Sequence, residues 1–271
     1  MTSVFREGQL KDKVALVTGG GSGINLAIAE RFAEHGAKVA LIGRTQEKLD
    51  AAVSGIAAHG GAAGGFAADV RNYEALTGAI NAAKEKFGGI DIVVCGAAGN
   101  FPAAALGMSA NGFKSVVDID LLGTFNTCRA VYEHLNRPGA SIVNISAPQA
   151  FVPMAMQAHV CAAKAGVDML TKTLALEWGP DGVRVNSIAP GPVNGTEGVR
   201  RLVPTEQARE RVTKMIPLRR LAETSDIADL ALFLCSAAAQ YITGAVMVCD
   251  GGQSLTPIRF DLLAREGAAA Q

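Results

Sequence analysis

Short, almost wholly apolar segments recur along the chain and alternate with longer stretches of helical spacing. Segments that are apolar on both faces are typical of parallel strands covered by helices on both sides. The strand candidates are KVALVTG (13–19), KVALIGR (38–44), GGFAADV (64–70), DIVVCG (91–96), ASIVNIS (140–146), VRVNSIAPG (183–191) and AVMVCDGG (245–252). Helical stretches at 25–36, 45–60 and 73–89 each end at a glycine suited to a left-handed cap. We therefore predict an α/β fold: a single doubly wound, Rossmann-type domain over residues 1–271 with a seven-stranded parallel sheet.

Composition excludes several classes of function. The 271 residues are 49% hydrophobic and carry 25 basic and 25 acidic side chains, so no net field attracts nucleic acid. No apolar run approaches the ~20 residues that a membrane span needs. The terminal AAAQ is not an SKL-type peroxisomal signal, and GAAAQ has the composition of a frayed end. We expect a soluble protein of the cytoplasm.

The five cysteines are scattered and form neither a CxxC pair nor a Cys/His cluster. We predict no metal site and no disulfide framework. Cys161 is the one cysteine near the suspected site, and we do not expect it to act as a nucleophile.

A glycine-rich turn follows the first predicted strand. TGGGSGIN (18–25) leads directly into an amphipathic helix, and its glycines let the backbone approach a pyrophosphate at the helix N-terminus. We predict that Gly19, Ser22, Gly23 and Ile24 bind a dinucleotide.

The second predicted strand ends at LIGRT, so Gly43 stands where an NAD-binding protein usually has an acidic residue. The guanidinium of Arg44 suits a 2′-phosphate, which favours NADPH or NADP⁺ over NAD(H). The alternative is that Arg44 is a solvated residue of a turn.

Over nearly its whole length the sequence resembles the short-chain dehydrogenase/reductase family. The resemblance is carried by TGGGSGI (18–24), ADV (68–70), LLGTF (121–125), LALEWGPDGVRVNSIAPGPV (174–193) and ITGAVMVCDGG (242–252). It implies an oxidoreductase, often a homotetramer. Further cofactor contacts that it implies are Asp69, Val70, Ala97, Lys164, Pro190, Gly191 and Val193.

The sequence departs from the family pattern at several places. The third glycine of the loop is Asn25, and the usual Asn-Asn-Ala-Gly run reads Gly96-Ala97-Ala98-Gly99. In the segment HVCAAKAG the catalytic lysine is present as Lys164, but the family's Ser, Tyr and Asn correspond to Ala147, Val160 and Asp120. None of the three tyrosines of the chain lies between the fifth predicted strand and Lys164, so a phenol is not expected to act as proton donor.

Four segments, AAGNF (97–101), DIDLLGTF (118–125), HVCAAKAGVDMLTKTLALEWGP (159–180) and PGPVNGTEGVRRL (190–202), resemble one branch of the family more than the family at large. That branch is the peroxisomal type of 2,4-dienoyl-CoA reductase, which also lacks the tyrosine. The resemblance implies that Asp120 and Lys164 are catalytic and hold a water that donates a proton. The reaction is consistent with these roles, because hydride addition at Cδ of a dienoyl thioester requires a proton at Cα and not on a ketone oxygen.

Asp120 follows Val116 and Val117 at helical spacing, which places it on an apolar face where an unpaired carboxylate is costly. The alternatives are a helix-capping or salt-bridged Asp120, or a functional Asp118. We interpret His159 as a packing or supporting residue, since it lies about 140° around the helix from Lys164. Ser146 is one residue from the family's serine position and on a strand would face the other way.

For the substrate, we predict contacts from Asn100, Phe101, Arg200 and Arg201. Residues 194–220 are interpreted as a helical flap over the site, whose Arg200, Arg201, Arg219 and Arg220 could meet coenzyme A phosphates. An ordinary solvated helix would have much the same sequence.

The sequence thus predicts an NADPH-dependent reductase that converts 2,4-dienoyl-CoA to 3-enoyl-CoA. Two alternatives stay open at this level. One is a reductase of another enoyl or conjugated carbonyl substrate, and the other is a non-catalytic NADP(H)-binding member of the family.

Overall fold

The structure is a computed structural model, and it describes residues 5–255. A seven-stranded sheet of parallel strands forms its centre, in the order β3-β2-β1-β4-β5-β6-β7. The strands are β1 Val14–Thr18, β2 Lys38–Gly43, β3 Ala62–Ala67, β4 Ile92–Cys95, β5 Ser141–Ile145, β6 Arg184–Pro190 and β7 Val246–Cys249. The predicted α/β fold is confirmed, and the strands coincide closely with the segments predicted for them.

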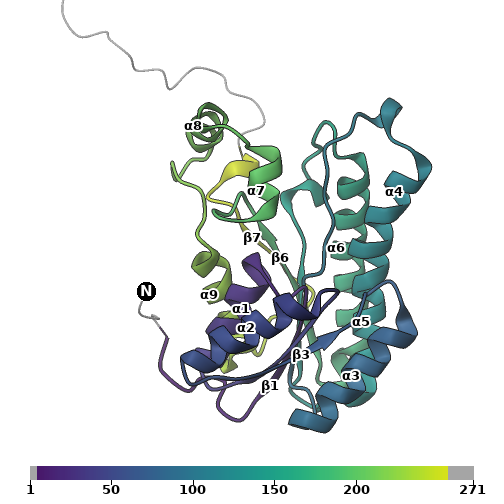
Figure 1. Cartoon of the computed structure of the whole chain (residues 1–271), viewed down its shortest axis with the longest axis vertical. Helices are drawn as coiled ribbons and strands as arrows, with labels where there is room; N and C mark the ends of the chain where they lie inside the picture. Colours follow the sequence, from purple (N-terminus) through teal and green to yellow (C-terminus); the bar gives the residue numbers. More distant parts are fainter. Residues whose placement is uncertain (1–4, 256–271) are drawn as a thin grey trace, which may run out of the picture.

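Helices cover both faces of the sheet. They are α1 Gly23–Glu34, α2 Gln46–Ala58, α3 Tyr73–Phe87, α4 Ala110–Val117, α5 Gly123–Val131, α6 Ala158–Trp178, α7 Glu197–Leu202, α8 Glu206–Met215 and α9 Thr224–Cys235. One layer contains α1, α2 and α9, the other α3, α4, α5 and α6, and α7 and α8 lie beyond one end of the sheet (Figure 1). Each face has its own apolar core, with Phe32 buried in one and Ile80 in the other.

The order of the strands reverses between β1 and β4, and this reversal positions the site. Thr18 at the end of β1 pairs with Ile42 of β2 on one side and with Cys95 of β4 on the other. The carboxyl ends of these strands are therefore level, and the loops that follow them meet at one edge of the sheet. That edge is where ligands bind in doubly wound sheets.

A π-helical turn, η2 (Asp118–Leu122), joins α4 to α5. The backbone stays helical through it, but the wider turn changes which side chains face inward. Asp120 is the residue of η2 that is buried. The sequence predicts a helix here, but not this change of pitch.

The glycines predicted to end the first two helices take the expected backbone conformation. Gly36 and Gly60, which follow α1 and α2, have φ of +91° and +80°, the region predicted for them. Among the described residues no helix combines the length and the apolarity that a membrane crossing requires. The terminal GAAAQ and its AAAQ lie outside the described residues.

Candidate functional site

A cavity of about 370 Å³ opens at the carboxyl edge of the sheet, between the loops after β1, β2 and β4. Of the predicted cofactor residues, the structure brings eight together in its wall. They are Gly19, Ser22, Gly23, Ile24, Arg44, Asp69, Val70 and Ala97. The predicted Lys164, Pro190, Gly191 and Val193 are not part of this wall, and Gly191 lines a second hollow of about 210 Å³.

The loop after β1 has the features of a phosphate cradle. A Cβ on Gly19 would lie 3.0 Å from the backbone nitrogen of Ala97, and one on Gly20 would lie 2.9 Å from the carbonyl oxygen of Val17. The N-cap Ser22 makes no side-chain capping bond, and the first turn of α1 has no acidic residue. The first N–H groups of α1 thus remain available to an anion, and the residues present fit the pyrophosphate of a dinucleotide.

Basic side chains lie at the β2 end of this cavity. Arg44 and Lys48 both line it, together with Thr45. Asp69 faces the same region and is held by Arg71, whose Nη2 donates to Oδ2 over 2.6 Å. The Arg71 hydrogen bonds lower the pKa of Asp69, with a smaller contribution from the charge of Arg44. Because Arg71 already neutralises Asp69, Arg44 and Lys48 give this end of the cavity a net positive charge.

Asp120 and Lys164 form a buried ion pair next to Ile119 and Ile145, which line the cavity. Lys164 Nζ lies 3.1 Å from Asp120 Oδ2, and the two side chains are 7% and 1% exposed. Lys164 also donates to the carbonyl oxygen of Ile145 at the end of β5, over 2.9 Å. Asp120 Oδ1 accepts the N–H of Gly99 over 2.7 Å. The pair is therefore tied to the end of β5 and to the loop that follows β4.

One oxygen of this carboxylate retains the capacity for another hydrogen bond. Asp120 Oδ2 has no hydrogen-bond partner within the described part of the chain, and its polar contact is the ion pair with Lys164. Because this oxygen has almost no exposed surface, a water reaches it only when the neighbouring side chains move. Asp118, by contrast, pairs with Lys114 on the outer side of the same helix, so the alternative assignment to Asp118 loses support.

An apolar side chain stands at the family's tyrosine position. Val160 is buried with Val116 and Ala163, against which Phe101 packs. The three tyrosines lie elsewhere: Tyr132 donates to Asp181, Tyr73 follows β3, and Tyr241 is fully exposed. The structure brings no phenol to Lys164.

His159 is fully buried, and its ring lies 4.5 Å from that of Phe101 in an edge-on contact. Neither ring nitrogen has a hydrogen-bond partner among the described residues. This agrees with the interpretation of His159 as a packing residue. Ser146 is also buried, and its hydroxyl has no such partner within residues 5–255.

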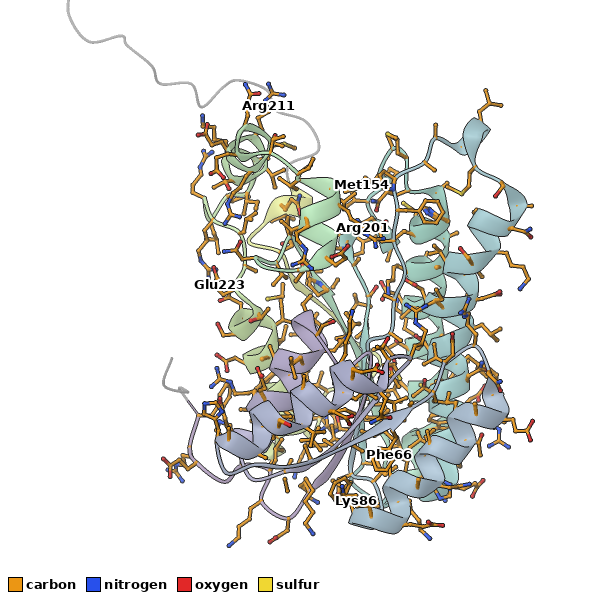
Figure 2. The ribbon with its side chains drawn as sticks, in the orientation of Figure 1. Phe66, Lys86, Met154, Arg201, Arg211 and Glu223 are labelled. Carbon is orange, nitrogen blue, oxygen red and sulfur yellow. The ribbon has the colours of Figure 1, made fainter. Side chains whose placement is uncertain are left out.

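The predicted substrate residues lie around a network of amides that the sequence did not indicate. Gln157 Nε2 donates to Asn100 Oδ1 over 3.2 Å, and Gln149 Nε2 donates to Gln157 Oε1 over 3.1 Å. The backbone carbonyl of Asn100 accepts from Arg201 Nη1 over 2.7 Å. The loop after β4, the segment between β5 and α6, and α7 are thus joined beside the catalytic pair, and Figure 2 shows Arg201 on the side of α7 that faces the α4 and α6 layer.

The four arginines predicted to meet coenzyme A phosphates have partners within residues 194–220 or in α9. Arg200 and Arg201 both bond to Glu197 and lower its pKa. Arg219 donates to the carbonyl oxygen of Lys214, and Arg220 forms a two-point pair with Asp226. The predicted flap contains α7 and α8, and Thr196, Glu197 and Gly198 close over the cofactor cavity. Its role in binding coenzyme A stays a prediction.

Several residues of the site were not predicted from the sequence. Lys48, Thr196 and Glu197 line the cavity, and Gln157 orients Asn100. Lys48 and Thr196 had a readable signal, since Lys48 lies one turn after Arg44 and Thr196 caps a short helix. Gln157 had none, because its contact depends on how two distant loops meet.

A dinucleotide cradle, a switch point in a parallel sheet and a buried lysine beside it define an oxidoreductase that uses a nicotinamide cofactor. A family model described as enoyl-(acyl carrier protein) reductase matches residues 19–254. The chain belongs to the short-chain dehydrogenase/reductase family, as its sequence motifs predict, and it is an enzyme. The non-catalytic alternative is therefore set aside.

Individual relatives belong to the same class of enzyme. The chain is 44% identical over 269 residues to the peroxisomal 2,4-dienoyl-CoA reductase of Arabidopsis thaliana, named as producing (3E)-enoyl-CoA, with 96% of this chain and 90% of that protein covered. It is 40% identical over 254 residues to a probable 2,4-dienoyl-CoA reductase of Bacillus subtilis, named as producing (2E)-enoyl-CoA, with 93% and 100% covered. Among solved structures, a short chain dehydrogenase from Bacillus anthracis superposes with a TM-score of 0.83 at 40% identity, over 92% of this chain and 100% of that one.

Proposed function

We propose that this enzyme reduces 2,4-dienoyl-CoA thioesters to 3-enoyl-CoA with NADPH. The observation that carries the proposal is the buried Asp120 and Lys164 pair in a site without a phenol among the described residues. A ketone reductase of this family needs a proton donor for the alkoxide, and Val160 cannot be one. The relatives named as dienoyl-CoA reductases support reduction of a dienoyl-CoA; the one from Arabidopsis thaliana is named for the 3-enoyl product and the one from Bacillus subtilis for the 2-enoyl product.

When bound, NADPH supplies the hydride that adds at Cδ of the dienoyl group. Asp120 Oδ2 holds a water by accepting one of its hydrogens, and the same water donates its other hydrogen toward Cα. Lys164 places a positive charge beside that water and stabilises the hydroxide that forms when the proton leaves. One hydride and one proton are added, and the remaining double bond lies between Cβ and Cγ, which is the 3-enoyl product.

The cofactor preference rests on charge. Arg44 and Lys48 offer a 2′-phosphate two cationic side chains, while Gly43 offers no carboxylate to a ribose hydroxyl. For the substrate, we propose contacts from Asn100 and Phe101, which follow the Gly99 that binds Asp120, and from Arg200 and Arg201 of α7; the bond from Arg201 to the backbone of Asn100 supports this. A cytoplasmic location and a homotetrameric assembly stay predictions; several of the relatives carry the word peroxisomal in their names.

The test follows consumption of NADPH with 2,4-hexadienoyl-CoA, crotonyl-CoA and a 3-oxoacyl-CoA. Selective turnover of the dienoyl thioester is expected. With NADPH deuterated at C4 of the nicotinamide and the reaction run in normal water, the product should carry deuterium at Cδ; in heavy water with ordinary NADPH, it should carry deuterium at Cα. Solvent deuterium at Cγ instead would indicate the 2-enoyl product, and equal turnover of the 3-oxoacyl thioester would refute the proposed chemistry.

A further inference from the structure

Asn25 and Gly96 both differ from the family pattern, and the two differences are the reverse of each other. The family's loop has a glycine where this chain has Asn25, and the run after β4 has an asparagine where this chain has Gly96. The two residues belong to segments far apart in the sequence, the start of α1 and the end of β4. In the structure they are in direct contact.

The side chain of Asn25 occupies the space beside Gly96. Its Nδ2 donates to the carbonyl oxygen of Gly96 over 2.7 Å. A Cβ built on Gly96 would lie 2.0 Å from Asn25 Oδ1 and 2.4 Å from its Cγ. No real Cβ approaches other atoms this closely, so a side chain at residue 96 and the present position of Asn25 exclude each other.

The contact joins the phosphate loop to the catalytic pair. On one side, a Cβ on Gly19 would lie 2.8 Å from Asn25 Nδ2, so Asn25 also lies against the first glycine of the cradle. On the other side, Gly96 is the first residue of the short run that ends at Gly99, whose N–H holds Asp120 Oδ1. The N–H of Gly96 in turn donates to Thr18 Oγ1 at the end of β1, over 3.1 Å.

We propose that Asn25 is a positioning residue, which fixes the end of β4 against the phosphate loop and so sets the relative placement of the cofactor and Asp120. Gly96 is required because Asn25 fills the volume that a side chain there would take. The inference rests on the proposed function for its catalytic consequence, but the coupling between residues 25 and 96 does not.

Substitutions at the two positions, alone and combined, test the coupling. Asn25→Ala removes the bond to Gly96 and should raise the Kd for NADPH roughly fivefold, the effect of about one hydrogen bond. Gly96→Ala should raise it further, because the new methyl displaces Asn25. The double variant Asn25→Gly with Gly96→Ala should have the same Kd for NADPH as Asn25→Gly alone, because the methyl group then occupies the space that Asn25 has left.

Gly20→Ala is the matched control. It adds a Cβ 2.9 Å from the carbonyl oxygen of Val17 and from Leu41 Cδ2 in the same region, without contact to Asn25. The rise that Gly20→Ala causes in the Kd for NADPH should stay the same when Asn25→Gly is added. If Gly96→Ala is equally harmful in the parent chain and in the Asn25→Gly variant, the proposed coupling is wrong.

Two further readouts separate positioning from simple stabilisation. Midpoints of thermal unfolding without cofactor should show the same rescue, which tests the coupling even if the protein fails to bind NADPH and the cofactor proposal falls. At saturating NADPH and dienoyl-CoA, kcat of Asn25→Ala should drop several-fold. An unchanged kcat and Kd with only a lower midpoint would leave Asn25 a structural residue and overturn its positioning role.

Discussion

Lys164 Nζ lies 3.1 Å from Asp120 Oδ2, inside a protein core and beside the open end of a parallel sheet. A buried ion pair is a poor source of stability, because the cost of removing two charges from water cancels most of their attraction. Apolar residues of similar size would fill this space as well. We therefore attribute the pair to catalysis and not to stability, because Asp120 Oδ2 can still accept a hydrogen bond.

The first prediction concerns this pair. Lys164→Met leaves Asp120 buried without its cation and should reduce the free energy of unfolding by about 3–5 kcal/mol. Adding Asp120→Asn removes the unpaired charge, so the double variant should regain much of that stability. Turnover of dienoyl-CoA should stay at least roughly 100-fold below that of the parent in both single variants and in the double variant, the effect of losing a positioned proton donor.

Chemical denaturation and steady-state kinetics measure the two effects on the same preparations. Recovery of activity together with stability in the double variant would show that the pair is structural. Because the double variant is expected to be folded, loss of turnover there cannot be ascribed to unfolding.

The fold was readable from the sequence because its signals are local. Most of the strands are short segments rich in apolar residues, and the first two helices each end before a glycine that takes a positive φ, Gly36 and Gly60. The burial of Asp120 was also readable, since Val116 and Val117 mark an apolar face at helical spacing. The π-helical turn was not, because no pattern in the sequence marks it.

The rest of the site depends on contacts between distant segments. The bond from Arg201 to Asn100 joins a helix after β6 to a loop after β4, and the contact of Asn25 with Gly96 joins α1 to β4. The sequence showed Asn25 and Gly96 as two separate departures from a family pattern. Only the structure shows that they share one volume.

The second prediction concerns the choice of cofactor. Arg44→Ala should raise the Kd for NADPH about 10- to 100-fold and leave that for NADH nearly unchanged, since a charge-assisted bond to the 2′-phosphate is lost. Lys86 is the control, because it lies over the ring of Phe87 at the opposite end of the sheet (Figure 2). Lys86→Ala should change neither constant. Equal weakening of NADH and NADPH by Arg44→Ala would contradict a role in recognising the phosphate.

The third prediction compares the neighbouring arginines of α7. Both pair with Glu197, but Arg201 also bonds to the backbone of Asn100. Arg201→Ala should raise KM for dienoyl-CoA roughly fivefold by releasing α7 from that loop, and it should raise the Kd for NADPH by a smaller factor, because Glu197 and Gly198 of α7 also line the cofactor cavity. Arg200→Ala should change KM by less than about twofold. A larger effect at Arg200 would instead favour direct contact of this exposed arginine with coenzyme A phosphates.

The last prediction separates Arg220 from substrate binding. Arg220 donates to both oxygens of Asp226, which also accepts the backbone N–H of Glu223 and caps α9. The hydrogen bonds from Arg220 lower the pKa of Asp226 below that of a free aspartate. A carboxylate with a lowered pKa in the folded state adds stability above its unfolded pKa of about 4, and this stability is lost as the pH falls through the folded value. The coupling between Arg220→Met and Asp226→Asn in a double-mutant cycle of unfolding should therefore be favourable at neutral pH and weaken steadily as the pH falls below about 4. KM for dienoyl-CoA should be unchanged in Arg220→Met, because the guanidinium of Arg220 is already bonded to Asp226. A several-fold rise in KM at neutral pH would instead indicate that Arg220 binds the substrate.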